Sequence, residues 1–181
     1  MALALSSNDL RDLLDRLHGS IIYVFDEDGI KKNHPNVSLY QRLTDIAELW
    51  VDAGPRTVGD IVDDVFSGAK RLVIRPDLWN EIDLQSVVDL TENELMASYH
   101  SSDIQKGIPH DMVFSQAHGI VLQFDERSLH LDFKMNSIIK QICKTKPTYV
   151  LDLRKQQSEK WNAFDVAGAF IPLDLMEVPG K

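Results

Sequence analysis

ELWVDAGPRTVGDI, residues 48–61, contains the transition from a strand to a helix that decides the fold. Its first half is an apolar run, which is typical of a strand buried on both faces of a sheet. Gly54-Pro55 then breaks the strand, and Thr57 begins a helix as its N-cap. The Asp, Gly and Arg at this transition fit two structures: an anion site at the start of the helix, or a turn without a ligand.

Six further apolar runs along the chain have the same character. Their centres lie about 21 to 28 residues apart, which is the spacing of units made of one strand and one helix. Apolar stripes with helical periodicity fill several of the gaps. The pattern predicts an α/β fold with a parallel sheet. The predicted strands are residues 21–25, 49–53, 72–74, 95–99, 120–124, 148–153 and 169–173.

The length of 181 residues predicts a single domain over residues 1–181. A leucine stripe that Gly19 closes predicts an N-terminal helix within residues 1–19. Two architectures compete for the predicted strands. One is a doubly wound open sheet, and the other is a (β/α)8 barrel that lacks one unit.

Composition and charge exclude several classes of protein. The net charge is −9, with 28 acidic and 19 basic residues, and this argues against a broad nucleic-acid-binding face. Cys143 is the only cysteine, so neither an internal disulfide nor a Cys-rich metal site is possible. No apolar run approaches the ~20 residues of a membrane span. The start of the sequence also lacks the basic region with which a secretory signal begins. We therefore expect a cytoplasmic protein with no nucleic-acid or membrane partner.

Residues 21–77 carry a resemblance to a known family through three motifs, the last of which runs on to Trp79. The motifs are YVFDEDGI followed by Asn36, then LWVDAGPRTVGDI, then SGAKRLVIRPDLW. In order and spacing they resemble the HisA/HisF family of histidine-biosynthesis barrels, and most of all the HisA-related proteins of archaea. The resemblance covers close to a third of the chain. It implies TIM-barrel-like (β/α) repeats, truncated or incomplete, with about seven parallel strands and no counterpart of the family's first strand.

The same resemblance implies an activity. The family's isomerases use two carboxylates, one on the first strand and one at the end of the fifth strand. The corresponding strand here ends in Ser98, Tyr99 and His100, so the usual catalytic pair is absent or rebuilt. We expect an isomerase or lyase acting on a small phosphorylated metabolite without a cofactor. The alternative is a non-catalytic relative that binds a ligand or regulates a partner.

Three residues at the ends of predicted strands are candidate catalytic groups: Asp26, His100 and Asp125. The carboxyl ends of barrel strands face the active site, where carboxylates and imidazoles transfer protons. The alternative for each Asp is a structural one, because Asp after a strand often bonds nearby loop amides. The histidines between residues 100 and 118 lack the spacing of a metal motif, and we expect no metal site.

Four residues are candidates for binding phosphate: Gly54, Arg56, Thr57 and Arg75. Gly54 permits close approach of backbone amides at the start of a helix, where an anion is favoured. Arg56 and Arg75 follow adjacent predicted strands, and two guanidinium groups at one edge favour an anionic ligand. The alternative is that both arginines form salt bridges with nearby aspartates.

The missing family strand has a consequence for assembly. A barrel short of one strand leaves apolar edges that invite pairing with another chain. We therefore expect a homodimer, or else an N-terminal helix that covers the gap. Cys143 lies on an apolar helical stripe, so we expect it in the core and not in a nucleophilic site.

Overall fold

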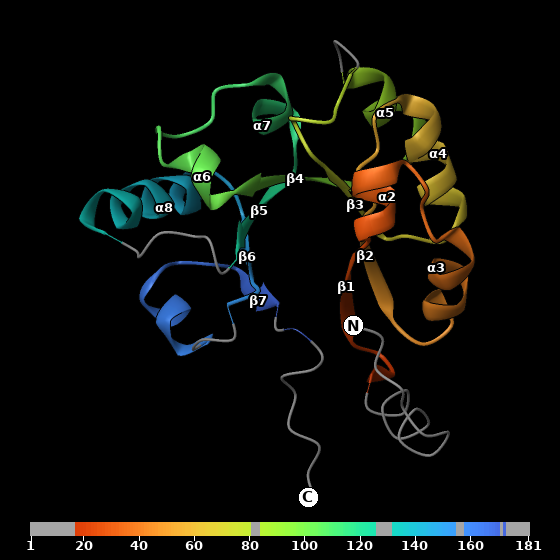
Figure 1. Cartoon of the computed structure of the whole chain (residues 1–181), viewed down its shortest axis with the longest axis horizontal. Coiled ribbons are helices and arrows are strands. Elements are labelled where there is room, and N and C mark those ends of the chain that lie inside the picture. The colour runs from red at the N-terminus through yellow and green to blue at the C-terminus, as the bar shows by residue number, and fades with distance from the viewer. Residues whose placement is uncertain (1–16, 81–83, 126–131, 155–157, 171, 173–181) are drawn as a thin grey trace, which may run out of the picture. The chain divides into compact units, whose positions relative to one another are not determined.

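The computed structural model describes residues 17–80, 84–125, 132–154, 158–170 and 172 (Figure 1). The chain divides into two compact units. The first unit comprises the residues up to 73 and residues 86–94, and the second comprises residues 74–85 and those from 95 onwards. The predicted N-terminal helix over residues 1–19 lies outside the described residues except for its last three positions. A single domain over residues 1–181 stays a prediction.

Seven parallel strands alternate with helices in the order of the chain, which confirms the predicted TIM-barrel-like (β/α) repeats. All seven overlap the predicted strands, although positions 171 and 173 of the last prediction lie outside the described residues. The strands are β1 (Ile21–Phe25), β2 (Glu48–Asp52), β3 (Arg71–Ile74), β4 (Glu94–His100), β5 (Gly119–Phe124), β6 (Thr148–Asp152) and β7 (Gly168–Phe170).

In the first unit, β1 pairs with β2 and β2 pairs with β3, in parallel. The middle strand is the most buried of the three, and Leu49, Trp50 and Val51 are fully buried. This explains its continuous apolar run, because helices cover a parallel sheet. The helices are α2 (Glu27–Lys32), α3 (Val37–Thr44), α4 (Val58–Phe66) and, apart from its first residue, α5 (Gln85–Leu90).

A glycine lets α2 lie directly against the end of β2. A Cβ atom at Gly29 would meet the carbonyl oxygen of Ala53 at 2.6 Å, a distance that no real side chain tolerates. Any other residue here would push α2 away from the strand. This close approach fixes the position of the loop that carries the predicted phosphate residues.

In the second unit, β4 pairs with β5, β5 with β6 and β6 with β7, all in parallel (Figure 1). Its helices are α6 (Ser101–Ile104), α7 (Met112–Gln116), α8 (Phe133–Thr145) and the 3-10 helix η1 (Ser158–Ala163). The predicted stripe of α8 is buried, but Cys143 is only half-buried, and burial raises the pKa of its thiol. In the core, Phe124 packs against Trp161 with ring centroids 4.8 Å apart.

Within the described ranges, no helix combines the length and the apolar character needed to cross a bilayer.

Candidate functional site

Asp26 is the N-cap of α2 and is buried. Its Oδ1 accepts hydrogen bonds from the backbone N–H groups of Asp28 (3.0 Å) and Gly29 (3.1 Å). Its Oδ2 accepts hydrogen bonds from the backbone N–H of Asn36 (2.8 Å) and the hydroxyl of Tyr40, and the Asn36 side-chain amide reaches both oxygens. Burial opposes ionisation, but these hydrogen bonds outweigh it and leave the pKa of Asp26 below its ordinary value. The carboxylate joins β1, α2 and α3.

Tyr40, which is fully buried in α3, completes this network. Burial, together with the hydrogen bond to Asp26, raises the pKa of its hydroxyl, which therefore remains a donor. Asn36, which belongs to the first sequence motif, supplies both its backbone and its side chain to the same carboxylate. The structure thus gives Asp26 structural partners on both oxygens.

Arg56 is bound to the C-terminal end of α2. Its Nη2 donates to the carbonyl of Ile30 at 2.8 Å. Its Nη1 donates to the Asn33 side chain at 2.6 Å and to the carbonyls of Gly54 at 2.9 Å and Gly29 at 3.4 Å. A cation is favoured at this end of a helix, where carbonyls lack partners within the helix. Four acceptors of the first unit therefore hold the guanidinium group.

The start of α4 already holds an anionic group of the protein itself. Thr57 is the N-cap, and its Oγ1 accepts a hydrogen bond from the Asp60 N–H at 3.4 Å. In return, Asp60 Oδ2 accepts hydrogen bonds from the backbone N–H groups of Arg56 (2.8 Å) and Thr57 (3.0 Å). This is a capping box. Gly54, with φ of 67°, makes the turn that leads into it. Two of the amides expected to bind phosphate are thus occupied by a carboxylate.

A second carboxyl group of α4, that of Asp64, lies against the same turn. Asp64 is buried and lines a small cavity of about 20 Å³ with Gly54 and Asp60. Burial, followed by repulsion from the neighbouring carboxylates of Asp60 and Asp63, raises the pKa of Asp64 to about 8. Near neutral pH this group is therefore largely protonated.

The second unit brings together the other predicted catalytic residues. His100 ends β4, Asp125 follows β5, and the His100 Nε2 atom lies 3.3 Å from Asp125 Oδ2. Their side chains are 28% and 31% exposed, so both remain accessible to a small molecule. Gln123 is the register partner of His100 on β5, and its Oε1 accepts a hydrogen bond from Arg75 Nη2 at 2.9 Å. Three predicted site residues thus belong to one polar cluster.

Ser102 defines the protonation of the histidine ring. Its backbone N–H donates to His100 Nδ1 at 3.2 Å, and its Oγ lies 2.8 Å from the same atom. Because a backbone N–H is only a donor, Nδ1 must be the nitrogen with the lone pair. The proton of the neutral ring then lies on Nε2, which faces Asp125. We call Arg75, His100, Ser102, Gln123 and Asp125 the histidine cluster.

A buried hydroxyl group lies on the same strand face as His100. Ser98 precedes His100 by two residues on β4, and alternate residues of a strand point to the same side. Ser98 is buried, and its Oγ has no hydrogen-bond partner in the part of the chain that the structure describes. An unsatisfied buried hydroxyl group is costly, so this position favours a polar ligand.

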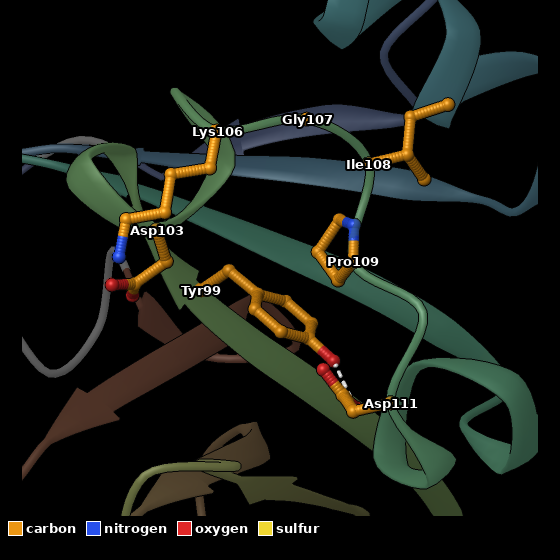
Figure 2. A pocket seen from close by; sticks show the side chains of 7 residues that line it. All are labelled: Tyr99, Asp103, Lys106, Gly107, Ile108, Pro109 and Asp111. Carbon is orange, nitrogen blue, oxygen red and sulfur yellow. Dashed lines mark hydrogen bonds between the residues drawn. The ribbon is translucent and has the colours of Figure 1, made fainter.

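A pocket of about 270 Å³ adjoins α6 (Figure 2). Tyr99, Ile108 and Pro109 line it, and the Tyr99 hydroxyl donates to Asp111 Oδ1 at 2.7 Å. Figure 2 shows the Lys106 side chain extending toward Asp103 at one end of the pocket. Asp103 connects the pocket to the histidine cluster, because its Oδ1 accepts a hydrogen bond from Ser102 Oγ at 3.4 Å.

Sequence reasoning did not identify Ser102, Gln123 or Ser98. Two signals were present. Gln123 precedes Asp125 by two residues, and Ser98 precedes His100 by two residues, so each shares a face with a residue that was predicted. Ser102 had no such signal, because its contact with His100 depends on the turn that begins α6.

Comparisons with known proteins give no relative. No protein-family model matches the chain, and a search of curated proteins finds no significant match. Within the described residues, no group of three or more His, Cys, Asp or Glu side chains is arranged to hold a metal ion. We therefore infer the function from the geometry of the histidine cluster.

Proposed function

We propose that the chain is an enzyme that transfers protons on a small phosphorylated metabolite, of the isomerase or lyase type. The observation that supports this proposal best is the pair formed by His100 and Asp125, 3.3 Å apart at the ends of adjacent strands and partly exposed. A partly exposed imidazole beside a carboxylate is a common general base.

His100 is the acid–base group in this proposal. Its Nδ1 carries the lone pair and takes a proton from the substrate, and this step requires both the hydroxyl and the N–H of Ser102 to release that atom. Asp125 then faces the Nε2–H of the imidazolium and favours the charged form. The proton returns to a neighbouring atom of the substrate in an isomerase, or to the leaving group in a lyase. Asp26 has no part in this mechanism, because its oxygens bind α2, Asn36 and Tyr40.

Arg75 is the proposed anion-binding group. Its guanidinium group donates a hydrogen bond to Gln123, which lies on β5 as the register partner of His100. Arg75 therefore lies beside the acid–base pair. The unsatisfied Ser98 hydroxyl adds a second polar group. Arg56, by contrast, is bound to α2, and Asp60 occupies the amides beside Thr57. We therefore assign the substrate phosphate to Arg75 and not to the turn at Gly54.

Kinship with the HisA/HisF family, a place in histidine biosynthesis and an archaeal origin remain predictions from the three motifs. A cytoplasmic location is part of the same proposal and is supported by the single cysteine. The expected homodimer is tested by light scattering after size exclusion, where a monomer at micromolar concentration would contradict it.

The alternative is a non-catalytic relative that binds a ligand. The occupied amides at the start of α4 favour it, because a phosphate there would have to displace Asp60. Under this alternative an anion still binds near Arg75, but no substrate proton exchanges with solvent.

The experiment combines binding and exchange. Inorganic phosphate and ribose 5-phosphate are added to the full chain, and the melting temperature is followed, since binding to the folded state raises it. Exchange of carbon-bound hydrogen for deuterium in a panel of sugar phosphates is then measured by NMR. We expect binding that Arg75→Ala weakens about tenfold, and exchange that His100→Asn removes.

His100→Asn is a matched variant because Asn is also a preferred N-cap, so α6 keeps its cap. Exchange at the wild-type rate in this variant would overturn the role of His100. Binding without exchange in any compound of the panel would favour the non-catalytic alternative. No rise in melting temperature with either probe would contradict a phosphorylated ligand.

A further inference from the structure

We infer that Ser102 is a nucleophile and that the histidine cluster supports acyl transfer from small esters. The inference uses the same His100–Asp125 pair as the proposed function but requires no phosphorylated substrate. It depends on three side chains in a row. Asp125 Oδ2 lies 3.3 Å from His100 Nε2, and His100 Nδ1 lies 2.8 Å from Ser102 Oγ.

The tautomer of His100 gives this row a direction. The Ser102 N–H identifies Nδ1 as the nitrogen with the lone pair, and Ser102 Oγ lies 2.8 Å from that atom. The hydroxyl donates its proton there when it turns from Asp103 and the longer N–H contact of 3.2 Å gives way. The other acceptor near that hydroxyl, Asp103 Oδ1, is 3.4 Å away and therefore weaker. A serine whose proton can pass to a histidine, with a carboxylate behind the ring, is the arrangement that activates a hydroxyl.

The exposure of the Ser102 side chain supports its role as the nucleophile. Both nitrogens of His100 are engaged, one toward Asp125 and one toward Ser102. The group at the outer end of the row is the Ser102 side chain, which is exposed. An electrophile that approaches from solvent therefore meets the Ser102 oxygen before it meets the ring.

These side chains supply both the nucleophile and the group that carries its proton. Ser102 Oγ attacks the carbonyl carbon of the ester, and its proton moves to His100 Nδ1. The tetrahedral intermediate then collapses, the carbon–oxygen bond to the alcohol breaks, and His100 returns the proton to the leaving alcohol. Water hydrolyses the acyl-serine in the same manner, with Nδ1 taking a proton from water and returning it to Ser102 Oγ. Asp125 faces the imidazolium that forms in both halves.

The adjoining pocket indicates the class of ester. It has a volume of about 270 Å³, and Tyr99, Ile108 and Pro109 give it apolar surface (Figure 2). Two carboxylates, Asp103 and Asp111, and one ammonium group, Lys106, also line it, so the excess of negative charge disfavours an anionic acyl group. A short, neutral acyl group fits this volume and this charge. Asp103, which lines the cavity, also accepts a hydrogen bond from Ser102 Oγ.

The test uses the full chain with a fluorophosphonate probe and with p-nitrophenyl acetate. We expect the probe to form an adduct on the peptide that contains Ser102, located by mass spectrometry, and p-nitrophenyl acetate to give a burst of nitrophenolate. Ser102→Ala is expected to reduce both by ~100-fold or more. Asp125→Asn is expected to slow labelling while leaving Ser102 as the labelled residue.

Ser115→Ala is the matched control, because Ser115 is exposed in the same unit but donates to the carbonyl of Met112. We expect it to react like the wild type. Absence of an adduct on Ser102, or labelling that Ser102→Ala leaves unchanged, would overturn the inference. The two proposals fail separately, because the adduct assay uses neither a phosphorylated compound nor hydrogen exchange.

Discussion

Asp26 and Asp125 follow parallel strands in the two units, yet their surroundings differ. Asp26 is buried and accepts hydrogen bonds from Asp28, Gly29, Asn36 and Tyr40. Asp125 is partly exposed and faces the ring of His100. A position after a strand therefore identifies a candidate, but the donors supplied by the following helices decide its role. A carboxylate that accepts this many hydrogen bonds holds elements of the fold together, whereas one that faces a partly exposed imidazole can act on a ligand.

The two arginines repeat this contrast. Arg56 donates to the Asn33 side chain and to backbone carbonyls of the first unit. Arg75 bonds a side chain, Gln123, next to the acid–base pair. Backbone carbonyls at a helix end have few other partners and hold a guanidinium firmly. We therefore expect mutations in the first unit to change stability, and mutations in the histidine cluster to change ligand chemistry.

The largest effect is expected for Asp26→Ala. It removes the N-cap of α2 and leaves the buried Tyr40 hydroxyl without its acceptor. The free energy of unfolding should fall by about 3 kcal/mol, measured by urea denaturation. Glu27→Ala, at the next position but exposed, is the control and should cause little change. A loss similar to the control would remove the distinction between Asp26 and Asp125.

Asp64→Asn should stabilise the protein at high pH. The pKa of Asp64 is about 8 in the folded state against 3.8 for an ordinary Asp, because burial and the carboxylates of Asp60, Asp63, Asp52 and Asp26 disfavour its charge. Stability from this group is complete below about pH 4 and is lost as the pH rises through 8. The variant lacks this loss, so its advantage should grow by about 2 kcal/mol between pH 5 and pH 6.5.

Urea denaturation of both proteins across that range measures the difference. Asp63→Asn is a useful comparison because Asp63 neighbours Asp64 in α4, and removing its charge should lower the pKa of Asp64. If the free-energy difference between wild type and Asp64→Asn were independent of pH, Asp64 would not be a protonated buried group.

The strands were predictable because a parallel sheet covered by helices needs continuous apolar runs, and β2 has one. The sequence also predicted His100 and Asp125 at the ends of two strands, but it did not pair them; the pairing comes from the two strands being neighbours. The partners of Asp26 did not follow, because Asn36 and Tyr40 reach it through the fold of α3. The capping box was predictable, because Thr57 and Asp60 have the spacing that it requires. We nevertheless interpreted the start of α4 as a phosphate site.

Arg56→Ala and Arg75→Ala should separate the two guanidinium groups. Arg56→Ala removes four hydrogen bonds at the end of α2, three of them to carbonyls, and should lower the free energy of unfolding by about 1.5 kcal/mol. Its dissociation constant for inorganic phosphate should remain that of the wild type. Arg75→Ala should weaken phosphate binding about tenfold, measured by isothermal titration calorimetry. The reverse result would return the phosphate to the turn at Gly54.

Ser102→Ala is expected to have the smallest effect on stability, within about 0.5 kcal/mol by urea denaturation. Ser102 is exposed, and the cap of α6 depends on its backbone N–H, which alanine retains. Asp103→Ala is the contrasting variant, because Asp103 accepts from the His100 N–H and completes the capping box. It should be the more destabilising of the two. If Ser102→Ala were as destabilising as Asp103→Ala, its hydroxyl would be holding the turn, and the short contact with His100 would be a structural bond like those around Asp26.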